Sequence, residues 1–186
     1  MSWPAPAGPA KGTNMALFDL FKKQDDSDPS VSTDWREGVV CAPVDGSLVQ
    51  LSETPDEVIA SGRLGQGVGI RPAGDTVFAP VSGTLSALAE THHALGITTD
   101  DGCQVIVHIG VNTVEMMGAG FAAYVEQDQR VEAGQALVRF SPEKIAAAGK
   151  DDTVFVVVSD HADYATVSPA ADAEVKAGQV VIELSK

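Results

Sequence analysis

The stretch Ala42-Pro43-Val44-Asp45-Gly46 recurs 37 positions later as Ala79-Pro80-Val81-Ser82-Gly83. A second motif, Val131-Glu132-Ala133-Gly134-Gln135, recurs 44 positions later as Val175-Lys176-Ala177-Gly178-Gln179. Each copy holds a turn-forming glycine and leads into an apolar segment that is typical of a strand. Two copies of two motifs predict an internally duplicated fold made of hairpins and tight turns. Similar hairpins occur in biotinyl and lipoyl carriers and in zinc peptidases, so the repeats predict architecture but no chemistry.

The chain after the first 34 residues is rich in strand signals and poor in helix signals. Short apolar segments alternate with glycine, proline and aspartate, and the whole chain holds 18 glycines and 10 prolines. Turn signals about every ten residues favour an antiparallel sandwich or barrel. We therefore expect an all-β fold, an antiparallel barrel-sandwich hybrid with internal duplication and one or two short helices. The expected helices are 55–60 and 142–149, and the clearest strands are 46–51, 77–80, 104–109 and 180–184.

Composition excludes several classes of function. The 186 residues carry a net charge of −14, which disfavours nucleic acid and anionic lipid as partners. No apolar run approaches the roughly 20 residues of a membrane-spanning helix. The two cysteines, Cys41 and Cys103, lack the spacing of a redox or metal motif and are too few for a disulfide framework. We expect a cytoplasmic protein.

The first 34 residues are predicted to form a disordered tail that precedes a domain at 35–186. Residues 1–14 consist mainly of proline, alanine and glycine, and 24–34 form an acidic linker. Between them, residues 15–24 place Leu17, Phe18, Leu20 and Phe21 on one side of a short helix. Because so short a helix is marginal in water, we expect weak or no membrane contact through this segment.

Two of the four histidines are predicted to meet in one hairpin. Residues 91–99 and 103–109 read as strands joined at Asp100-Asp101-Gly102, a strong hairpin signal. With a turn centred on the Asp100–Asp101 bond, His93 lies directly opposite His108. His108 falls on the less buried face of its strand. The remaining histidines, His92 and His161, are expected to be structural or solvated.

The partner strand leaves one question open. His93 shares its predicted face with Leu95 and Ile97. Either that face carries an exposed apolar patch suited to protein docking, or a bulge shifts the register. The residues alone also leave a structural and a reactive role for the two histidines about equally supported.

From about residue 40 onward the sequence resembles the glucose-type IIA component (EIIA) of the bacterial phosphoenolpyruvate-dependent sugar phosphotransferase system. Besides the repeats, the segments that carry the resemblance are 90–94, 107–115 and 118–121, in family order. The resemblance implies that 35–186 form one such EIIA domain. It implies that His108 carries the phosphoryl group on Nε2, that His93 lies beside it, and that Thr91 joins their hydrogen-bond network.

The resemblance also implies partners. HPr is the expected phosphoryl donor and the IIB domain of a sugar permease the expected acceptor, and regulatory target proteins are a further class of partner. No cofactor is required. A zinc ion held by His93 and His108 is expected only where a partner supplies further ligands. The expected docking residues are Asp56, Ile59, Ala89, Ile106, Asn112 and Val114.

Several docking positions depart from the family pattern. Asn112 stands where the family commonly has aspartate, which removes one charge from the rim. Ile59, Ala89 and Ile106 stand where aromatic residues are frequent. We therefore expect docking to be tuned to a different carrier.

Three other interpretations compete with the phosphoryl carrier. A zinc peptidase of related fold needs H-x-H and H-x-x-x-D, and the sequence contains neither. A biotinyl or lipoyl carrier needs a lysine at a hairpin tip, and Asp100-Asp101-Gly102 offers none. A regulatory binding module that uses the same histidine face without transferring phosphate stays open.

Overall fold

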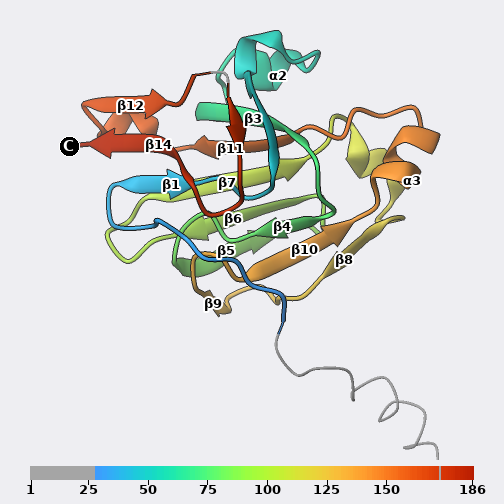
Figure 1. Ribbon diagram of the computed structural model, residues 1–186, viewed down its shortest axis with the longest axis horizontal. Coiled ribbons are helices and arrows are strands. Elements are labelled where there is room, and N and C mark those ends of the chain that lie inside the picture. Colours follow the sequence, from blue (N-terminus) through green and yellow to red (C-terminus); the bar gives the residue numbers. More distant parts are fainter. Residues whose placement is uncertain (1–27, 172) are drawn as a thin grey trace, which may run out of the picture.

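A computed structural model describes residues 28–171 and 173–186, and its fold is all-β (Figure 1). The strands form three antiparallel sheets, ordered β13-β2-β3-β11-β7-β6-β5-β9, β1-β14-β12 and β4-β10-β8. These described residues contain no closed barrel. The strands are β1 (Val39–Cys41), β2 (Gly46–Gln50), β3 (Gln66–Pro72), β4 (Thr76–Phe78), β5 (Gly83–Leu88), β6 (Ala94–Thr98), β7 (Gln104–Ile109), β8 (Phe121–Ala123), β9 (Arg130–Val131), β10 (Ala136–Phe140), β11 (Val154–Val158), β12 (Thr166–Pro169), β13 (Glu174–Val175) and β14 (Val180–Ser185).

The helices are short. They are α2 (Glu57–Ala60), α3 (Pro142–Ala147) and the single-turn 3₁₀ helices η1 (Leu51–Glu53), η2 (Thr113–Met116) and η3 (His161–Asp163). Both expected α-helices are confirmed. The hydroxyl of Ser141 accepts a hydrogen bond from the Lys144 amide at 3.3 Å, so it caps α3 as the sequence predicts.

The centre of the large sheet is fully apolar. Every residue of β11 is buried, and β11 pairs with β3 along one edge and with β7 along the other. β7 instead alternates between buried and half-exposed residues. One face of β7 therefore packs into the core and the other, which carries His108, remains accessible.

The duplication is visible in the hydrogen bonds between the repeats. The Cys41 amide donates to the Pro80 carbonyl at 2.9 Å, and the Phe78 amide donates to the Pro43 carbonyl at 2.7 Å. The two donors lie 37 positions apart in the sequence, and so do the two acceptors. Each repeat therefore binds the other in the same way. The predicted internal duplication is confirmed.

The second motif repeats its contacts as well. The side chain of Asp45 accepts from the Ala177 amide at 2.8 Å, and that of Ser82 accepts from the Ala133 amide at 2.9 Å. Within each turn the glutamine closes the loop, since Gln135 and Gln179 accept from amides of their own turns at 3.1 and 2.7 Å. These bonds explain why both motifs recur together.

The domain begins earlier than the sequence predicts. Residues 29–34, which we call the arm, are hydrogen-bonded to both repeated turns. The Val31 amide donates to Gly134 and the Asp34 amide donates to Gly178, each at 2.9 Å. The expected linker ending at residue 34 is therefore wrong for the arm, because these residues form part of the folded domain. The segment 15–24 and the rest of the expected tail up to residue 27 lie outside the described residues.

No helix in the part of the chain described here is long and apolar enough to cross a membrane.

Candidate histidine site

The hairpin that carries the site is shifted by one residue from the predicted register. β6 starts at Ala94, and Ala94, not His93, pairs with His108. Leu95 pairs with Val107 and both are buried, so the apolar face of β6 points into the core. The question left open by the sequence is answered by this shift, because His93 lies before the strand and does not share that face.

His93 nevertheless reaches His108. The two ring centroids are 5.1 Å apart and the ring planes lie at 85°, an edge-to-face contact. A turn at His92, with φ of +58°, bends the chain just before β6. The backbone stays attached to the neighbouring strand, since the Ile109 amide donates to the His93 carbonyl at 2.7 Å.

Thr91 holds the His93 ring. Its Oγ1 lies 2.6 Å from His93 Nδ1, as the expected hydrogen-bond network requires. Because Nδ1 is engaged, Nε2 is the nitrogen of His93 that is available to a second group. Thr91, His93 and His108 thus form one connected group.

An apolar cluster lies beside His108. Phe155 on β11 pairs directly with His108 and its ring centroid is 6.5 Å away. Phe155 packs with Ile59 and Val111, and all three side chains are buried. This layer limits the freedom of the half-buried imidazole.

Both imidazoles favour their neutral forms. Burial lowers the pKa of His93 below its ordinary value. Burial also lowers the pKa of His108, and the nearby His93 adds to that shift, whereas the Gly110 backbone and the Asp56 carboxylate oppose it. Neutral imidazole carries a lone pair on one ring nitrogen, so this environment keeps His108 nucleophilic near neutral pH.

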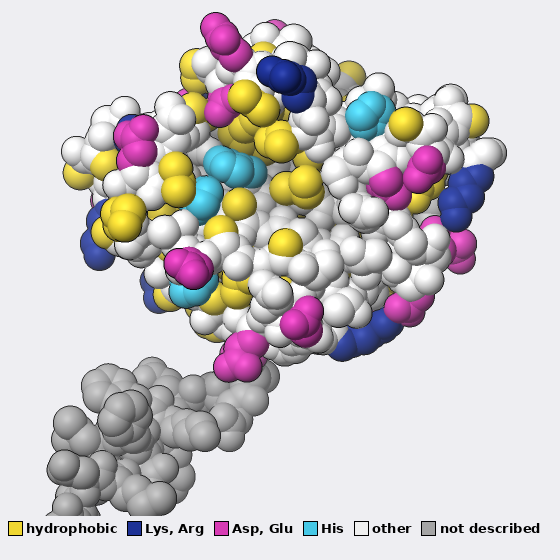
Figure 2. All heavy atoms as spheres, turned by 180° about the vertical axis from the view of Figure 1, so that it is seen from behind, with side chains coloured by type: hydrophobic (Ala, Val, Ile, Leu, Met, Phe, Trp, Pro, Cys, Tyr) yellow, Lys and Arg dark blue, Asp and Glu magenta, His cyan; other side chains and the backbone are white. Residues whose placement is uncertain are grey.

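The expected docking residues lie at different depths. Val114 is 50% exposed and Asn112 is exposed, while Ala89 and Ile106 line a shallow hollow of about 500 Å³ together with Ala94 and Gly96. Ile59 is only 2% exposed, so it supports the surface from below and offers no docking contact. Figure 2 shows histidine side chains of this face among hydrophobic ones, with acidic side chains at the edge.

The expected docking residue Asp56 also has a structural role in α2. Its carboxylate accepts hydrogen bonds from the amides of Val58 and Ile59 at 2.8 and 3.1 Å, and so caps α2. The same carboxylate acts electrostatically on His108. An acid at this position therefore both fixes α2 and faces the site.

Sequence reasoning missed two exposed apolar side chains. Val58 on α2 is 47% exposed and Met117 after η2 is 82% exposed. The available signal was an apolar residue two positions after Asp56 and another three positions after Val114. With Val114, they are the large hydrophobic residues that stand out as exposed in the described parts of the chain.

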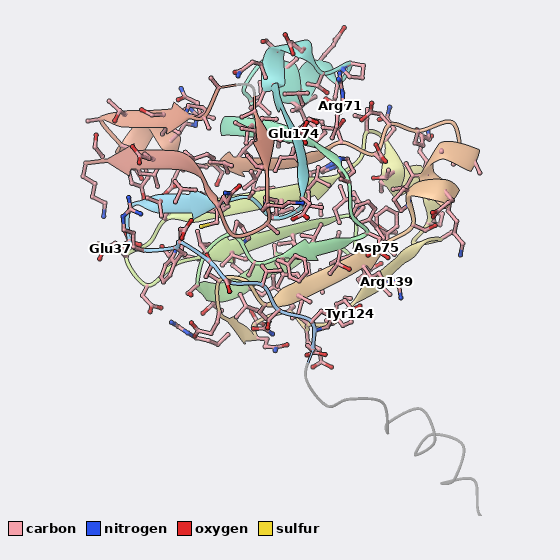
Figure 3. The ribbon with its side chains drawn as sticks, viewed as in Figure 1. Glu37, Arg71, Asp75, Tyr124, Arg139 and Glu174 are labelled. Atoms are coloured by element: carbon pink, nitrogen blue, oxygen red, sulfur yellow. The ribbon has the colours of Figure 1, made fainter. Side chains whose placement is uncertain are left out.

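A further hollow on the described part of the chain has no histidine in its lining. It measures about 850 Å³ and is lined by the β3–β4 turn, β8, β10 and the start of α3. Asp75 and Arg139, which are labelled in Figure 3, line this hollow and form a 3.0 Å ion pair. Its walls contain no histidine or cysteine, so size alone does not mark the reactive site.

A metal site is incomplete. No group of three or more histidine, cysteine or acidic side chains in residues 28–171 and 173–186 is arranged to hold an ion. His93 and His108 offer two of the four ligands that zinc usually binds. Both cysteines, Cys41 and Cys103, are buried and form no disulfide, so neither thiol is placed as a metal ligand at the surface.

Residues 38–164 match the family model of the phosphoenolpyruvate-dependent sugar phosphotransferase system, EIIA 1. The chain belongs to this EIIA family. It is 36% identical over 163 residues to the PTS system glucose-specific EIIA component of Halalkalibacterium halodurans, an alignment covering 88% of this chain and 92% of the relative. The resemblance in the sequence to a glucose-type EIIA component is confirmed, and the chain is a component of the sugar phosphotransferase system.

Other relatives of this EIIA protein are longer. It is 42% identical over 147 residues to the PTS system beta-glucoside-specific EIIBCA component of Halalkalibacterium halodurans. This alignment covers 79% of this chain but only 23% of the relative. The chain therefore spans about a quarter of the length of such relatives. The fold agrees with glucose permease IIA from Mycoplasma capricolum, with a TM-score of 0.70, 36% identity, and coverage of 77% of this chain and 93% of that one.

Proposed function

We propose that this EIIA domain carries a phosphoryl group on Nε2 of His108, receives it from phospho-HPr and passes it to a IIB domain. The observation that carries the proposal is the edge-to-face contact between two neutral imidazoles, one of them held by Thr91, on an accessible apolar face. Membership of the EIIA family supports the same role.

The transfer step needs only positioned groups. The Nε2 lone pair of His108 attacks phosphorus, the new N–P bond forms, and the bond between phosphorus and the donor's nitrogen breaks, leaving its electron pair on the donor. His93, whose Nδ1 is engaged by Thr91, presents Nε2 as a hydrogen-bond donor to a phosphoryl oxygen. In-line transfer of this kind depends mainly on positioning and charge stabilisation.

The partners follow from the surface and from the relatives. Exposed apolar side chains surround the histidines and the chain is strongly acidic, which suits a protein surface with apolar and basic groups. The EIIBCA relatives are named for A, B and C components in one protein, and this supports a IIB domain as the acceptor. A zinc ion shared between the two histidines and a partner is compatible with their geometry.

The test is incubation with phosphoenolpyruvate, Enzyme I and HPr, followed by intact mass measurement. We expect one phosphate per chain that is lost in acid, since a phosphohistidine hydrolyses there whereas a serine ester survives. His108→Ala should abolish labelling, and His161→Ala should keep it. Labelling of the His108→Ala variant at the wild-type level would refute the site, and no labelling of a folded wild type would favour a purely regulatory module.

A further inference from the structure

The hollow of about 850 Å³ beside β8, which we call the β8 hollow, has no part in the proposed phosphoryl transfer. Its volume is in the range of cavities that bind ligands. Its lining combines apolar with charged residues, among them Pro72, Phe121, Phe140, Pro142, Glu143 and Lys144. None of the ion pairs between described residues engages Glu143 or Lys144. The β8 hollow therefore offers apolar area together with one carboxylate and one ammonium outside any such pair.

The arm directs the preceding chain toward the β8 hollow. Ser30 forms an antiparallel bridge with Gln135, and the Ala136 amide donates to the Pro29 carbonyl at 2.9 Å. In an antiparallel pair, each step backward along one strand matches a step forward along the other. The described chain upstream of Ser30 therefore runs in the same direction as β10, toward Phe140 in the lining of the hollow.

The upstream end of the arm also lies beside β8. The Tyr124 amide donates to the Leu137 carbonyl at 2.9 Å, so Tyr124 and Pro29 are bound to neighbouring residues of β10. β8 begins at Phe121, which lines the hollow, and ends next to Tyr124. Tyr124 and Arg139, a further lining residue, are labelled in Figure 3. The short strand β8 thus connects the arm with the hollow.

The chain upstream of the arm is long enough to reach the β8 hollow. Phe140 lies four positions after Ala136, which corresponds to about 13 Å along a strand at roughly 3.3 Å per residue. Residue 24 is five positions before Pro29, and five residues span up to about 17 Å when extended. Residues before position 25 can therefore contact the hollow.

The segment 15–24, which lies outside the described residues, has side chains that such a hollow binds. It contains four large hydrophobic residues followed by two lysines: Leu17, Phe18, Leu20, Phe21, Lys22 and Lys23. Its apolar side chains gain free energy when they leave water. Its lysines complement Glu143, and its Asp19 complements Lys144. Because the segment is tethered, its effective concentration at the hollow is on the order of millimolar, so weak contacts suffice.

We propose that the β8 hollow is an intramolecular docking site for the segment 15–24. The hydrophobic side chains of the segment bind against Phe121 and Pro142, and its lysines lie toward Glu143. Docking withdraws the segment from other surfaces, among them membranes and other proteins. The proposal does not depend on phosphoryl transfer, because the lining of the hollow contains no histidine.

Amide ¹H–¹⁵N NMR spectra of the full chain test the docking. The wild type is compared with the double variant Phe18→Asp and Phe21→Asp, which removes apolar contacts without touching the folded domain. We expect amide shift changes in the domain to be confined to the segments that line the hollow, 73–75, 120–122 and 139–144. Thr13→Asp, a change upstream of the segment, is the control and should leave these amides unchanged.

A bulky charge in the hollow should release the segment. Ala122 is exposed and lines the hollow, so Ala122→Arg fills the space without disturbing the core. Trypsin cleavage after Lys22 and Lys23 reports the release, because a segment docked for about nine-tenths of the time is cut about ten-fold more slowly. We expect this protection in the wild type and its loss in Ala122→Arg. Ala148→Arg, at an exposed position outside the lining, should keep it.

The same measurements distinguish other occupants of the hollow and other sites for the segment. Unchanged lining amides in the Phe18→Asp and Phe21→Asp variant would overturn the proposal. Trypsin protection that grows with protein concentration would instead assign the segment to a second copy of the chain. Protection that appears only with phosphatidylglycerol vesicles would assign it to a membrane surface. Absence of phosphate on His108 in a chain with intact protection would count against the proposed function alone.

Discussion

His93 touches His108 ring to ring at 5.1 Å although it belongs to no strand, while the residue that pairs with His108 in the sheet is Ala94. The contact is diagonal, so the orientation of His93 depends on the bend at His92 and on the Thr91 hydrogen bond. A ring held in this way can be replaced without altering the strand that carries His108.

We expect His93→Gln to separate the two half-reactions. Glutamine keeps a hydrogen-bond donor but is no imidazole, so phosphorylation from HPr should persist while transfer to IIB slows by about 10²-fold, a usual cost of losing one preorganised donor. Quenched-flow measurement of both steps checks this, with His161→Gln as the control. Equal loss of both steps would indicate that His93 is needed for folding or is itself the acceptor.

Acidification should destabilise the domain through its two half-buried histidines, His93 and His108. Both have a folded pKa below the ordinary 6.5, so the unfolded chain binds more protons as the pH falls through that value. Stability is thus full above about pH 6.5 and decreases as the pH falls toward the folded pKa values. Urea unfolding at about pH 7.5 and about pH 5.5 measures the loss.

The matched variant for the pH measurement is the double substitution His93→Gln and His108→Gln. Its stability should change less between the two pH values than that of the wild type. Carboxylates with lowered pKa, such as Asp45, lose their contribution only in a more acidic range. A wild type that becomes more stable on acidification would contradict the assignment of neutral, half-buried rings.

Gly178→Ala should release the arm. A Cβ atom there would lie 2.1 Å from the Ser32 carbonyl oxygen, and the φ of Gly178 is +90°. We expect a loss of about 1–3 kcal/mol in the free energy of unfolding and faster cleavage by trypsin after the exposed Arg36. Gly102→Ala is the control, because Gly102 has a similar φ of +92° with open space around it. Equal effects of both substitutions would show that the arm contributes nothing.

Zinc should bind weakly to the isolated chain. The two imidazoles leave two positions of a tetrahedral site without a protein ligand, and the described residues offer no third ligand nearby. Calorimetric titration should therefore show no stoichiometric site of about nanomolar affinity. Such a site in the isolated chain would favour the metalloenzyme interpretation. Phosphorylation of His108 would block the ligand nitrogen and should abolish any zinc-dependent partner binding.

The architecture could be predicted because the repeats make the same local bonds twice. Asp45 and Ser82 each accept from the equivalent amide of a V-x-A-G-Q turn, so matching sequences gave matching structure. The arm could not be predicted, because its shortest bonds to the two turns, from the amides of Val31 and Asp34, are made between backbone atoms. The sequence indicates Gly134 and Gly178 as turn formers, and in the structure they also admit the close approach of the arm.

The contact between His93 and His108 could be predicted from the sequence, but the register of their hairpin could not. The positive φ at His92 is rare for a residue other than glycine, and nothing in the sequence signals it. A one-residue shift reverses the faces of a strand, which is why Leu95 and Ile97 are buried rather than exposed. The resemblance predicts Ile59 as a docking residue, whereas in the structure Ile59 is buried and packs with Phe155.

The most direct test of the central claim identifies the atom that carries the phosphoryl group. The chain is labelled with ¹⁵N-histidine, phosphorylated with phosphoenolpyruvate, Enzyme I and HPr, and the ¹⁵N–³¹P coupling is measured. We expect one coupled nitrogen, Nε2 of His108, and no coupling in the His108→Ala variant. A coupling to Nδ1 of His108, to either nitrogen of His93, or a phosphate without a nitrogen partner would contradict the account.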